Sequence, residues 1–199
     1  MARMNVENEK PIRTFLAIEL PRDIQILIKG MQERLMPVLR EIRWTRPDGI
    51  HLTLKFFGDL FQDDVTRISE VVGRLARDSH PMELNIGLPG GFPTLKRPRV
   101  LWLGIGGDTL RLTTLQAALE KELEEAGFPG DTRSFKPHLT VGRARSRGGV
   151  ITGTEAVMEN AGKLEASRFD VRELILFKSE LKPGGAVYTK VAGFPFRGQ

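Results

Sequence analysis

Two kinds of hydrophobic pattern follow one another along this chain, and together they predict a protein of mixed α and β structure. Strict alternation of polar and apolar residues is typical of strands, whereas apolar residues three and four positions apart are typical of helices. Pro89-Gly90-Gly91 is expected to end one strand, and the turn at Lys182–Gly185 is expected to join the last two strands in a hairpin. The patterns predict strands at 12–20, 42–45, 50–57, 82–88, 100–106, within 168–181 and at 186–194, and helices at 21–40, 62–78, 109–126 and 154–164.

The predicted elements contain a duplication, because the order strand, helix, strand, helix occurs twice. The second strand of each copy opens with nearly the same four residues, His51-Leu52-Thr53-Leu54 and His138-Leu139-Thr140-Val141. On a strand, the histidine and threonine of each tetrad share one face and the two apolar residues share the other. Each copy would thus anchor its apolar side in a core and present an imidazole and a hydroxyl.

A single tetrad would indicate only a half-buried strand with an ordinary histidine. Two tetrads in a chain of three histidines favour a site instead. If the copies face each other across a groove, two imidazoles and two hydroxyls can act on a phosphate diester without a metal ion. The third histidine, His80, precedes Pro81 in a loop and is expected to be an ordinary surface residue.

Residues that follow the tetrads add candidates for binding. By alternation, Lys55 and Phe57 share the face of His51, where a lysine can reach a phosphate and an aromatic ring can stack on a base. The alternatives are a solvated rim lysine and a core aromatic. Arg143 lies five residues after His138, so strict alternation points it away, but a bulge at Gly142 would turn it back. Arg145 and Arg147 follow in a glycine-flanked loop, where they either extend a basic site or are simply exposed.

Composition narrows the class of protein. A chain of 199 residues with a net charge of +5 can bury one core, and its modest basic balance favours anionic partners. The absence of cysteine excludes disulfides and thiolate catalysis. We expect one domain over residues 10–197 after a lead-in at 1–9, with no membrane span and no secretory signal. The glycines near Gly104 do not form a dinucleotide motif, because Thr109 stands where glycine is required.

Motifs spread over nearly the whole chain resemble one family. The segments are RTFLAIELP, WTRPDGIHLTLKFFGD, RPRVLWLGI, FKPHLTVGRAR and LFKSELKPGGAVYTKV. They are similar to the two-histidine (2H) phosphoesterases, and specifically to the RNA 2′,3′-cyclic phosphodiesterases, also called 2′-5′ RNA ligases (the LigT/ThpR group). The resemblance implies a bilobal α+β fold, with two pseudo-symmetric lobes that each have an antiparallel sheet and outer helices around an active-site cleft.

The resemblance also implies a role for each site residue. His51 would be the proton donor and His138 the proton acceptor, while Thr53, Thr140 and Arg143 would bind the phosphate oxygens. Tyr188 resembles a position near the family's cleft. The implied reaction is metal-independent hydrolysis of RNA 2′,3′-cyclic phosphate ends to 2′-phosphomonoesters, with 2′-5′ ligation as its reverse. No cofactor is expected, and the reference imidazole pKa of about 6.5 suits both proton transfers.

Other functions remain open on the sequence alone. The same chemistry can act on a small cyclic nucleotide or a 2′-5′ oligonucleotide, and an RNA-binding protein without catalysis is a further alternative. The leading prediction is a cytoplasmic monomer whose partner is RNA with a cyclic phosphate end, tRNA fragments among the candidates.

Overall fold

A computed structural model describes residues 11–198 except 147–149, 163, 165–166 and 184. The predicted lead-in at 1–9 therefore lies outside the described residues. The two predicted strand–helix–strand–helix units are both present, with additional strands within and after them. The elements are β1 Ile12–Glu19, α1 Arg22–Leu35, β2 Ile42–Trp44, a 3₁₀ turn at Pro47–Gly49, β3 His51–Leu60, α2 Gln62–Asp78, β4 Met82–Thr94, β5 Arg97–Gly107, α3 Thr109–Glu125, β6 His138–Ala144, α4 Glu155–Gly162, β7 Arg168–Val171, β8 Glu173–Lys182 and β9 Gly185–Pro195.

The strands form two similar antiparallel halves that meet at the tetrad strands. The strand order is β7-β4-β5-β6-β3-β1-β8-β9, and β2 adds to β6 off this path. One half is β3-β1-β8-β9 and the other is β6-β5-β4-β7, so β3 and β6 are equivalent inner strands. A single residue pair, Leu52 with Leu139, joins the halves. The α+β class with two antiparallel lobes is confirmed, with the difference that the lobes share one continuous sheet path.

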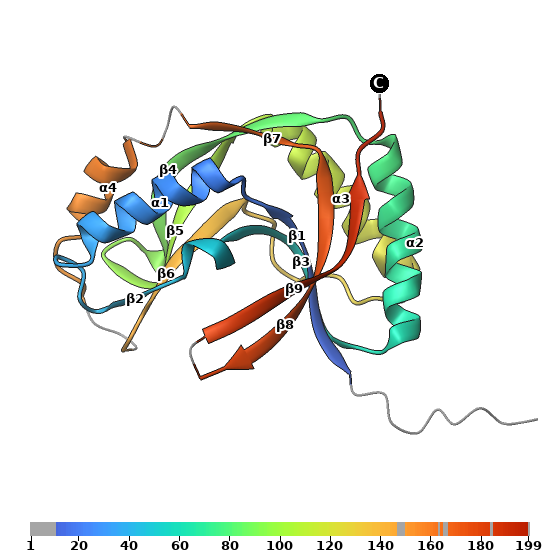
Figure 1. The fold of residues 1–199 in the computed structure, drawn as a ribbon, viewed down its shortest axis with the longest axis horizontal. Coiled ribbons are helices and arrows are strands. Elements are labelled where there is room, and N and C mark those ends of the chain that lie inside the picture. The colour runs from blue at the N-terminus through green and yellow to red at the C-terminus, as the bar shows by residue number, and fades with distance from the viewer. Residues whose placement is uncertain (1–10, 147–149, 163, 165–166, 184, 199) are drawn as a thin grey trace, which may run out of the picture.

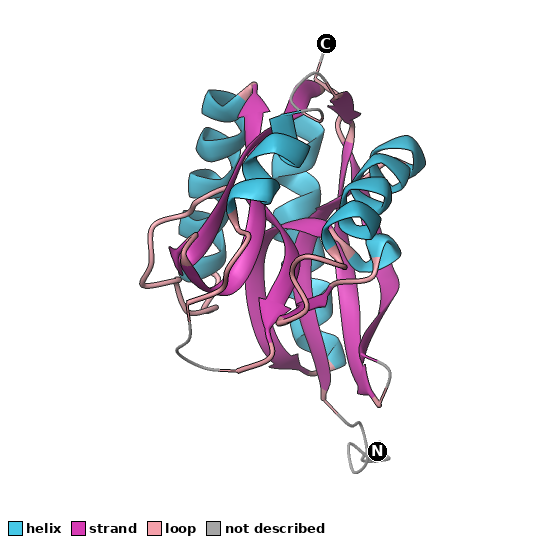
Figure 2. Cartoon of the chain, turned by 90° about the vertical axis from the view of Figure 1, so that its left-hand side faces the viewer, coloured by secondary structure: helices cyan, strands magenta, loops and turns pink. Residues whose placement is uncertain are grey.

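Helices cover the side of the sheet opposite the histidines. Figure 1 shows α1 and α4 on the side of β4, and α2 beside β8 and β9 with α3 packed against α2. In the view of Figure 2 the strands run between helices, because the sheet is curled and its helix-covered face turns outward. Leu52 and Leu139 are fully buried in the main core, together with the apolar stripe of α3 at Leu112, Leu115, Leu119 and Leu123. This packing fixes the apolar side of each tetrad and leaves the other side to His and Thr.

Two expectations about strand boundaries were wrong. Pro89-Gly90-Gly91 does not end a strand, because β4 continues to Thr94 through a register shift between Ile86 and Pro89. Proline is tolerated there because β7 pairs only with residues 82–85 of β4, which leaves that edge unpaired at Pro89. The segment 168–181 contains two strands rather than one, since β7 pairs with β4 and β8 pairs with β1.

The hairpin of β8 and β9 is confirmed, with Lys182 opposite Gly185 at its tip. Within the part of the chain that the structure describes, no helix is both long and apolar enough to cross a membrane.

Candidate active site

The two tetrads lie side by side on the neighbouring strands β3 and β6. Because these strands are antiparallel and Leu52 pairs with Leu139, His51 lies opposite Thr140 and Thr53 lies opposite His138. All four polar residues therefore point to one face, called here the histidine face. In a regular ladder such a diagonal places the two histidine Cα atoms about 7–8 Å apart. The predicted set of two imidazoles and two hydroxyls is thus assembled within one sheet.

Both imidazoles are held by the same kind of hydrogen bond. The Nδ1–H of His51 donates to the carbonyl oxygen of Gly49 (3.0 Å), and that of His138 donates to the carbonyl oxygen of Lys136 (2.6 Å). Each acceptor lies two residues before its histidine. Since a carbonyl oxygen can only accept, Nδ1 carries the hydrogen in both rings. Nε2 of each ring is then the nitrogen left to exchange a proton with a ligand.

The two rings differ in their surroundings. His51 stacks on Phe15, with ring centroids 4.5 Å apart, and Tyr188 meets it edge-on at 5.1 Å. Phe15 and Phe177 belong to a small apolar cluster on the histidine face, separate from the main core. Burial among these rings lowers the pKa of His51 to about 4, against a smaller raising effect from the Gly49 carbonyl. In the free protein His51 is therefore neutral at pH 7.

His138 lies against rings from the other half of the sheet. Phe92 meets it edge-on at 5.1 Å, and Trp102, which pairs with Thr140 in the ladder, lies at 6.1 Å. Sequence reasoning missed these two rings and also Phe15 and Phe177. The five residues 14–18 of β1 are all buried, so alternation could not show which side of that strand faces the site.

A bulge in β6 turns Arg143 onto the histidine face, as the sequence predicted. Trp102 pairs with Thr140, but the next residue of β5, Leu101, pairs with Gly142, so Val141 is the extra residue. Arg143 is consequently opposite Val100 and exposed to solvent. Gly142 is required at this point, because a Cβ there would lie 2.5 Å from Cγ2 of Ile42 on the neighbouring β2.

A matching bulge in β3 overturns the prediction for Lys55. Ala17 pairs with Thr53 and Leu16 pairs with Lys55, so Leu54 is the extra residue and the alternation reverses after it. The side chain of Lys55 is 3% exposed and its Nζ lies 2.7 Å from Oε1 of Glu120 on α3. The same ammonium also donates to the carbonyl oxygen of Pro129 (2.8 Å). Lys55 therefore lies in an ion pair on the helix side of the sheet and not on the face of His51, where alternation had predicted it.

The reversal also moves Phe57 away from the site. Phe57 packs on the main core and meets Phe128 edge-on at 6.0 Å, so it does not share the face of His51 and the alternative of a core aromatic is confirmed. Phe56 takes its place on the histidine face, where it pairs with Phe15 and is 60% exposed. Phe56 and Arg143 are equivalent, since each lies five residues after a tetrad histidine and just past a bulge.

Two glutamines support the bulges from the helix side. The buried amide of Gln32 on α1 donates to the carbonyl oxygen of the bulge residue Val141 (3.1 Å) and to that of Thr45 (2.9 Å). Gln116 on α3 donates in the same way to the carbonyl oxygen of Leu54, the bulge residue of β3 (3.4 Å). The carbonyl oxygen of Val141 also accepts from the backbone N–H of Thr45 (2.9 Å), so Gln32 adds a second donor there. Gln32 thus holds the strand geometry that aims Arg143.

The other residues predicted for the site are two threonines, one tyrosine and two arginines. Thr53 and Thr140 are half-buried, and within the described residues neither hydroxyl has a hydrogen-bond partner. Tyr188 lies against His51, as noted above. Arg145 donates through Nε to the carbonyl oxygen of Arg40 (3.2 Å), while Arg147 lies outside the described residues.

A shallow hollow elsewhere on the surface does not suit a phosphate. It is lined by Pro21, Asp23, Glu83, Arg168, Phe169 and Asp170. Three of these residues are carboxylates, and the one arginine is paired with Glu83 at 2.9 Å. The hollow contains neither histidine, so the histidine face remains the candidate site.

Comparison with known proteins finds a family model and relatives that match most of this chain. The family model of the 2′-5′ RNA ligase superfamily matches residues 41–183. The RNA 2′,3′-cyclic phosphodiesterase of Methanothermobacter thermautotrophicus is 33% identical over 186 residues, which is 92% of this chain and 98% of that protein. The protein of the same name from Thermotoga maritima is 31% identical, over 94% of this chain and 97% of its own.

Solved structures share the fold. The crystal structure of TT0787 from Thermus thermophilus superposes with a TM-score of 0.74 at 28% identity, and covers 94% of this chain and 100% of that one. The crystal structure of E. coli LigT complexed with 3′-AMP superposes with a TM-score of 0.73 at 25% identity, and covers 94% of this chain and 98% of that one.

Proposed function

Because this chain belongs to the 2′-5′ RNA ligase superfamily, we propose that it hydrolyses 2′,3′-cyclic phosphate ends of RNA to 2′-phosphomonoesters, with the two tetrad histidines as acid and base. The observation that carries this proposal is that the same kind of hydrogen bond orients both imidazole rings. Each donates Nδ1–H to a backbone carbonyl, so both Nε2 atoms belong to the histidine face. Relatives that match this chain over most of their length are named for the same activity.

The proposed reaction needs one proton removed and one supplied. Nε2 of neutral His138 takes a proton from water as the water oxygen bonds to phosphorus. The bond from phosphorus to the ribose 3′-oxygen breaks, and Nε2–H of His51 gives its proton to that oxygen. The products are a 2′-phosphomonoester and a 3′-hydroxyl, and proton exchange with solvent restores both rings. A positioned acid or base of this kind contributes about 10²–10⁴-fold.

Charge on the phosphoryl oxygens needs donors as the bond to water forms. In our proposal the hydroxyls of Thr53 and Thr140, which share the histidine face, donate to the non-bridging oxygens. Arg143 adds a fixed positive charge on the same face, and a guanidinium pairs with two phosphate oxygens at once. Donors held in place before the reaction stabilise the transition state without reorganising.

The low pKa of His51 implies that its proton arrives with the substrate. Burial lowers the pKa to about 4, so the donor form is scarce in the free protein at pH 7. A phosphodiester anion beside Nε2 favours the imidazolium and raises the pKa again. In our proposal, the anionic substrate therefore loads the acid that later protonates its leaving oxygen.

This coupling predicts the titration of His51. We expect its imidazole Hε1 resonance to titrate with a midpoint near pH 4 in the free protein, and nearer neutrality in saturating inorganic phosphate. The lowered pKa of His51 also makes the free energy of unfolding depend on pH. As the pH falls, the unfolded chain, in which the ring has a pKa of 6.5, binds a proton before the folded protein does. The stability contributed by neutral His51 is complete above pH 6.5 and is lost as the pH falls toward 4. A free-protein midpoint near 6.5, or no upward shift with phosphate, would contradict the coupling.

Independence from metal ions is a further part of the proposal. Among the described residues, no group of three or more His, Cys, Asp or Glu side chains is placed to hold a metal ion. The acid, the base and the charge-stabilising donors named above complete the reaction without a Lewis acid.

The direct test is ³¹P NMR of the protein with an RNA oligonucleotide that ends in a 2′,3′-cyclic phosphate, in the presence of EDTA. The strained cyclic phosphate signal is expected to convert to that of a 2′-phosphomonoester at an undiminished rate. Activity lost in the chelator and restored by a divalent ion would overturn metal independence. A 3′-phosphomonoester would overturn the assignment of the leaving oxygen.

The same groups can run the reaction in reverse, and we include 2′-5′ ligation of a 5′-hydroxyl end to the cyclic phosphate as a second activity of the site. We further propose that residues 10–197 act as one domain and as a cytoplasmic monomer. Hydrolysis of a small cyclic nucleotide, or RNA binding without turnover, are the alternatives that the same NMR experiment separates when both substrates are tested.

A further inference from the structure

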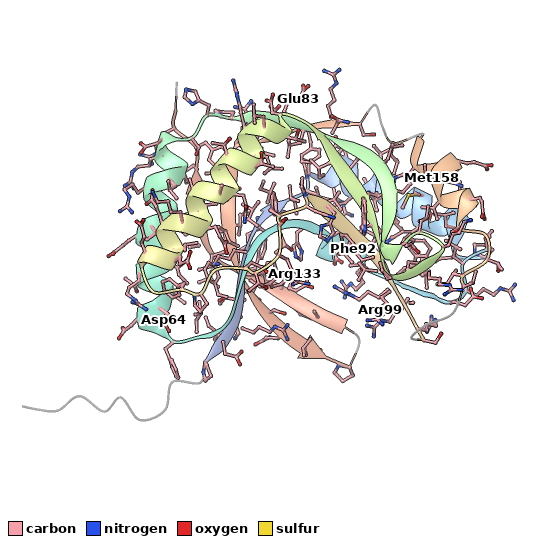
Figure 3. All side chains as sticks on the ribbon, turned by 180° about the vertical axis from the view of Figure 1, so that it is seen from behind. Asp64, Glu83, Phe92, Arg99, Arg133 and Met158 are labelled. Carbon is pink, nitrogen blue, oxygen red and sulfur yellow. The ribbon has the colours of Figure 1, made fainter. Side chains whose placement is uncertain are left out.

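Arg43 and Arg143 lie opposite each other on the histidine face beyond Thr140, and Arg99 is close to them in the sheet. Arg143 on β6 pairs with Arg43 on β2 on one side and with Val100 on β5 on the other. Arg99 precedes Val100 on β5. Val100 pairs with Phe92 and Pro98 pairs with Pro93, so Arg99 is the extra residue of a bulge. Figure 3 labels Phe92 and Arg99 on the same part of the β4–β5 pair. Directly opposite residues share a face, so Arg43 joins Arg143 there.

This arrangement is unfavourable without an anion. Like charges directly opposite in a ladder destabilise it. Arg43, Arg99 and Arg143 are all exposed, and within the described residues none of them has a carboxylate partner. Six other arginines of the described chain form ion pairs, at positions 46, 67, 74, 133, 168 and 172. A bound polyanion would offset the repulsion between Arg43 and Arg143.

The opposite end of the histidine face has a different character. There the small cluster around Phe15 is apolar, and the nearby lysines are already neutralised. Lys178 pairs with Glu180 at 2.8 Å, and Lys190 pairs with Glu19 at 2.5 Å. The arginine side therefore offers further phosphates unpaired guanidinium groups, while a nucleoside finds aromatic rings on both sides of the histidines.

We propose that Arg43 and Arg99 form a second phosphate subsite, which binds the phosphodiester upstream of the cyclic end, so that the substrate is an RNA strand and not a single nucleotide. This inference rests on the function proposed above and specifies its substrate class. Arg143 contacts the reacting phosphate, and Arg43 and Arg99, on the strands either side of it, hold the next one. Guanidinium groups bind phosphates bidentately and release counterions, which makes the interaction sensitive to salt.

The experiment compares two substrates, a ten-nucleotide RNA with a 2′,3′-cyclic phosphate end and 2′,3′-cyclic AMP. The measured quantity is the ratio of kcat/KM for the RNA to kcat/KM for the mononucleotide. We expect Arg43→Gln with Arg99→Gln to lower this ratio by about 5–10-fold per arginine. The slope of log(kcat/KM) for the RNA against log salt should flatten by about 0.7 for each arginine–phosphate pair removed. The control Arg77→Gln removes one positive charge from α2, as much as either single replacement, and should leave both quantities unchanged.

The possible outcomes separate the two proposals. If the unmodified protein opens neither substrate, the proposed function fails. If it opens both but the double variant keeps the ratio and the salt slope, only the second subsite is overturned. An equal loss on both substrates would also overturn it, because the arginines would then act at the reacting phosphate. Arg43→Lys with Arg99→Lys guards against a folding defect: it should restore the salt slope and recover only part of the ratio, since lysine keeps the charge without the bidentate geometry.

Discussion

Replacement of either tetrad histidine by alanine is expected to lower kcat on a cyclic phosphate end by about a thousandfold or more. Each ring performs one of the two proton transfers, and such a transfer contributes about 10²–10⁴-fold. Because His51 and His138 act on one transition state, the double variant should be little worse than the slower single variant. The measurement is single-turnover hydrolysis of the cyclic RNA, with thermal unfolding followed in parallel to show that each variant is folded.

The third histidine supplies the matched control. His80 lies between α2 and β4, outside the histidine face, and His80→Ala should retain normal turnover. Near-normal rates in His51→Ala or His138→Ala would mean that the tetrads are structural. Strict additivity of the two losses would mean that the rings do not act in one step.

Lys55→Met is expected to lower the free energy of unfolding by about 2–4 kcal/mol, because it leaves Glu120 without its buried cation. Lys55 is 3% exposed and Glu120 is 20% exposed, so water relieves only part of the cost. The same carboxylate also accepts a hydrogen bond from the backbone N–H of Asp131. Chemical denaturation measures the effect, and kcat of the folded variant should change far less than the stability.

Two further variants isolate the ion pair. Lys121→Met, on the same helix as Glu120, removes an exposed lysine whose pair with Glu125 is 3.9 Å long, and should change stability by less than about 0.5 kcal/mol. Glu120→Leu added to Lys55→Met should recover much of the loss, because no buried charge then remains unpaired. If Lys55→Met instead keeps the free energy of unfolding of the unmodified protein and binds RNA poorly, Lys55 acts as a substrate ligand.

The sequence predicted the parts of this protein that depend on local pattern. Polar and apolar alternation identified both tetrads as strands, and helical spacing identified the buried stripe of α3. The glycine after Val141 indicated the bulge that turns Arg143, and the motifs around His51 and His138 identified the family. These features hold because side-chain direction on a regular strand or helix is set by the chain's own period.

The tertiary structure decided where that period breaks and what each face meets. The bulge at Leu54 has no glycine to announce it, so Lys55 and Phe57 were assigned to the wrong side and Phe56 was missed. The supporting bond from Gln32 to Val141 joins residues far apart in the chain.

The aromatic rings around the histidines show the same limit. Phe15 reaches His51 only because β1 pairs with β3, and Phe92 reaches His138 only through the pairing of β4, β5 and β6. A local pattern records which residues share a side of one strand. The extra residue in a ladder, the neighbouring strand and the pKa of a buried imidazole depend on long-range pairing, which only the folded chain determines.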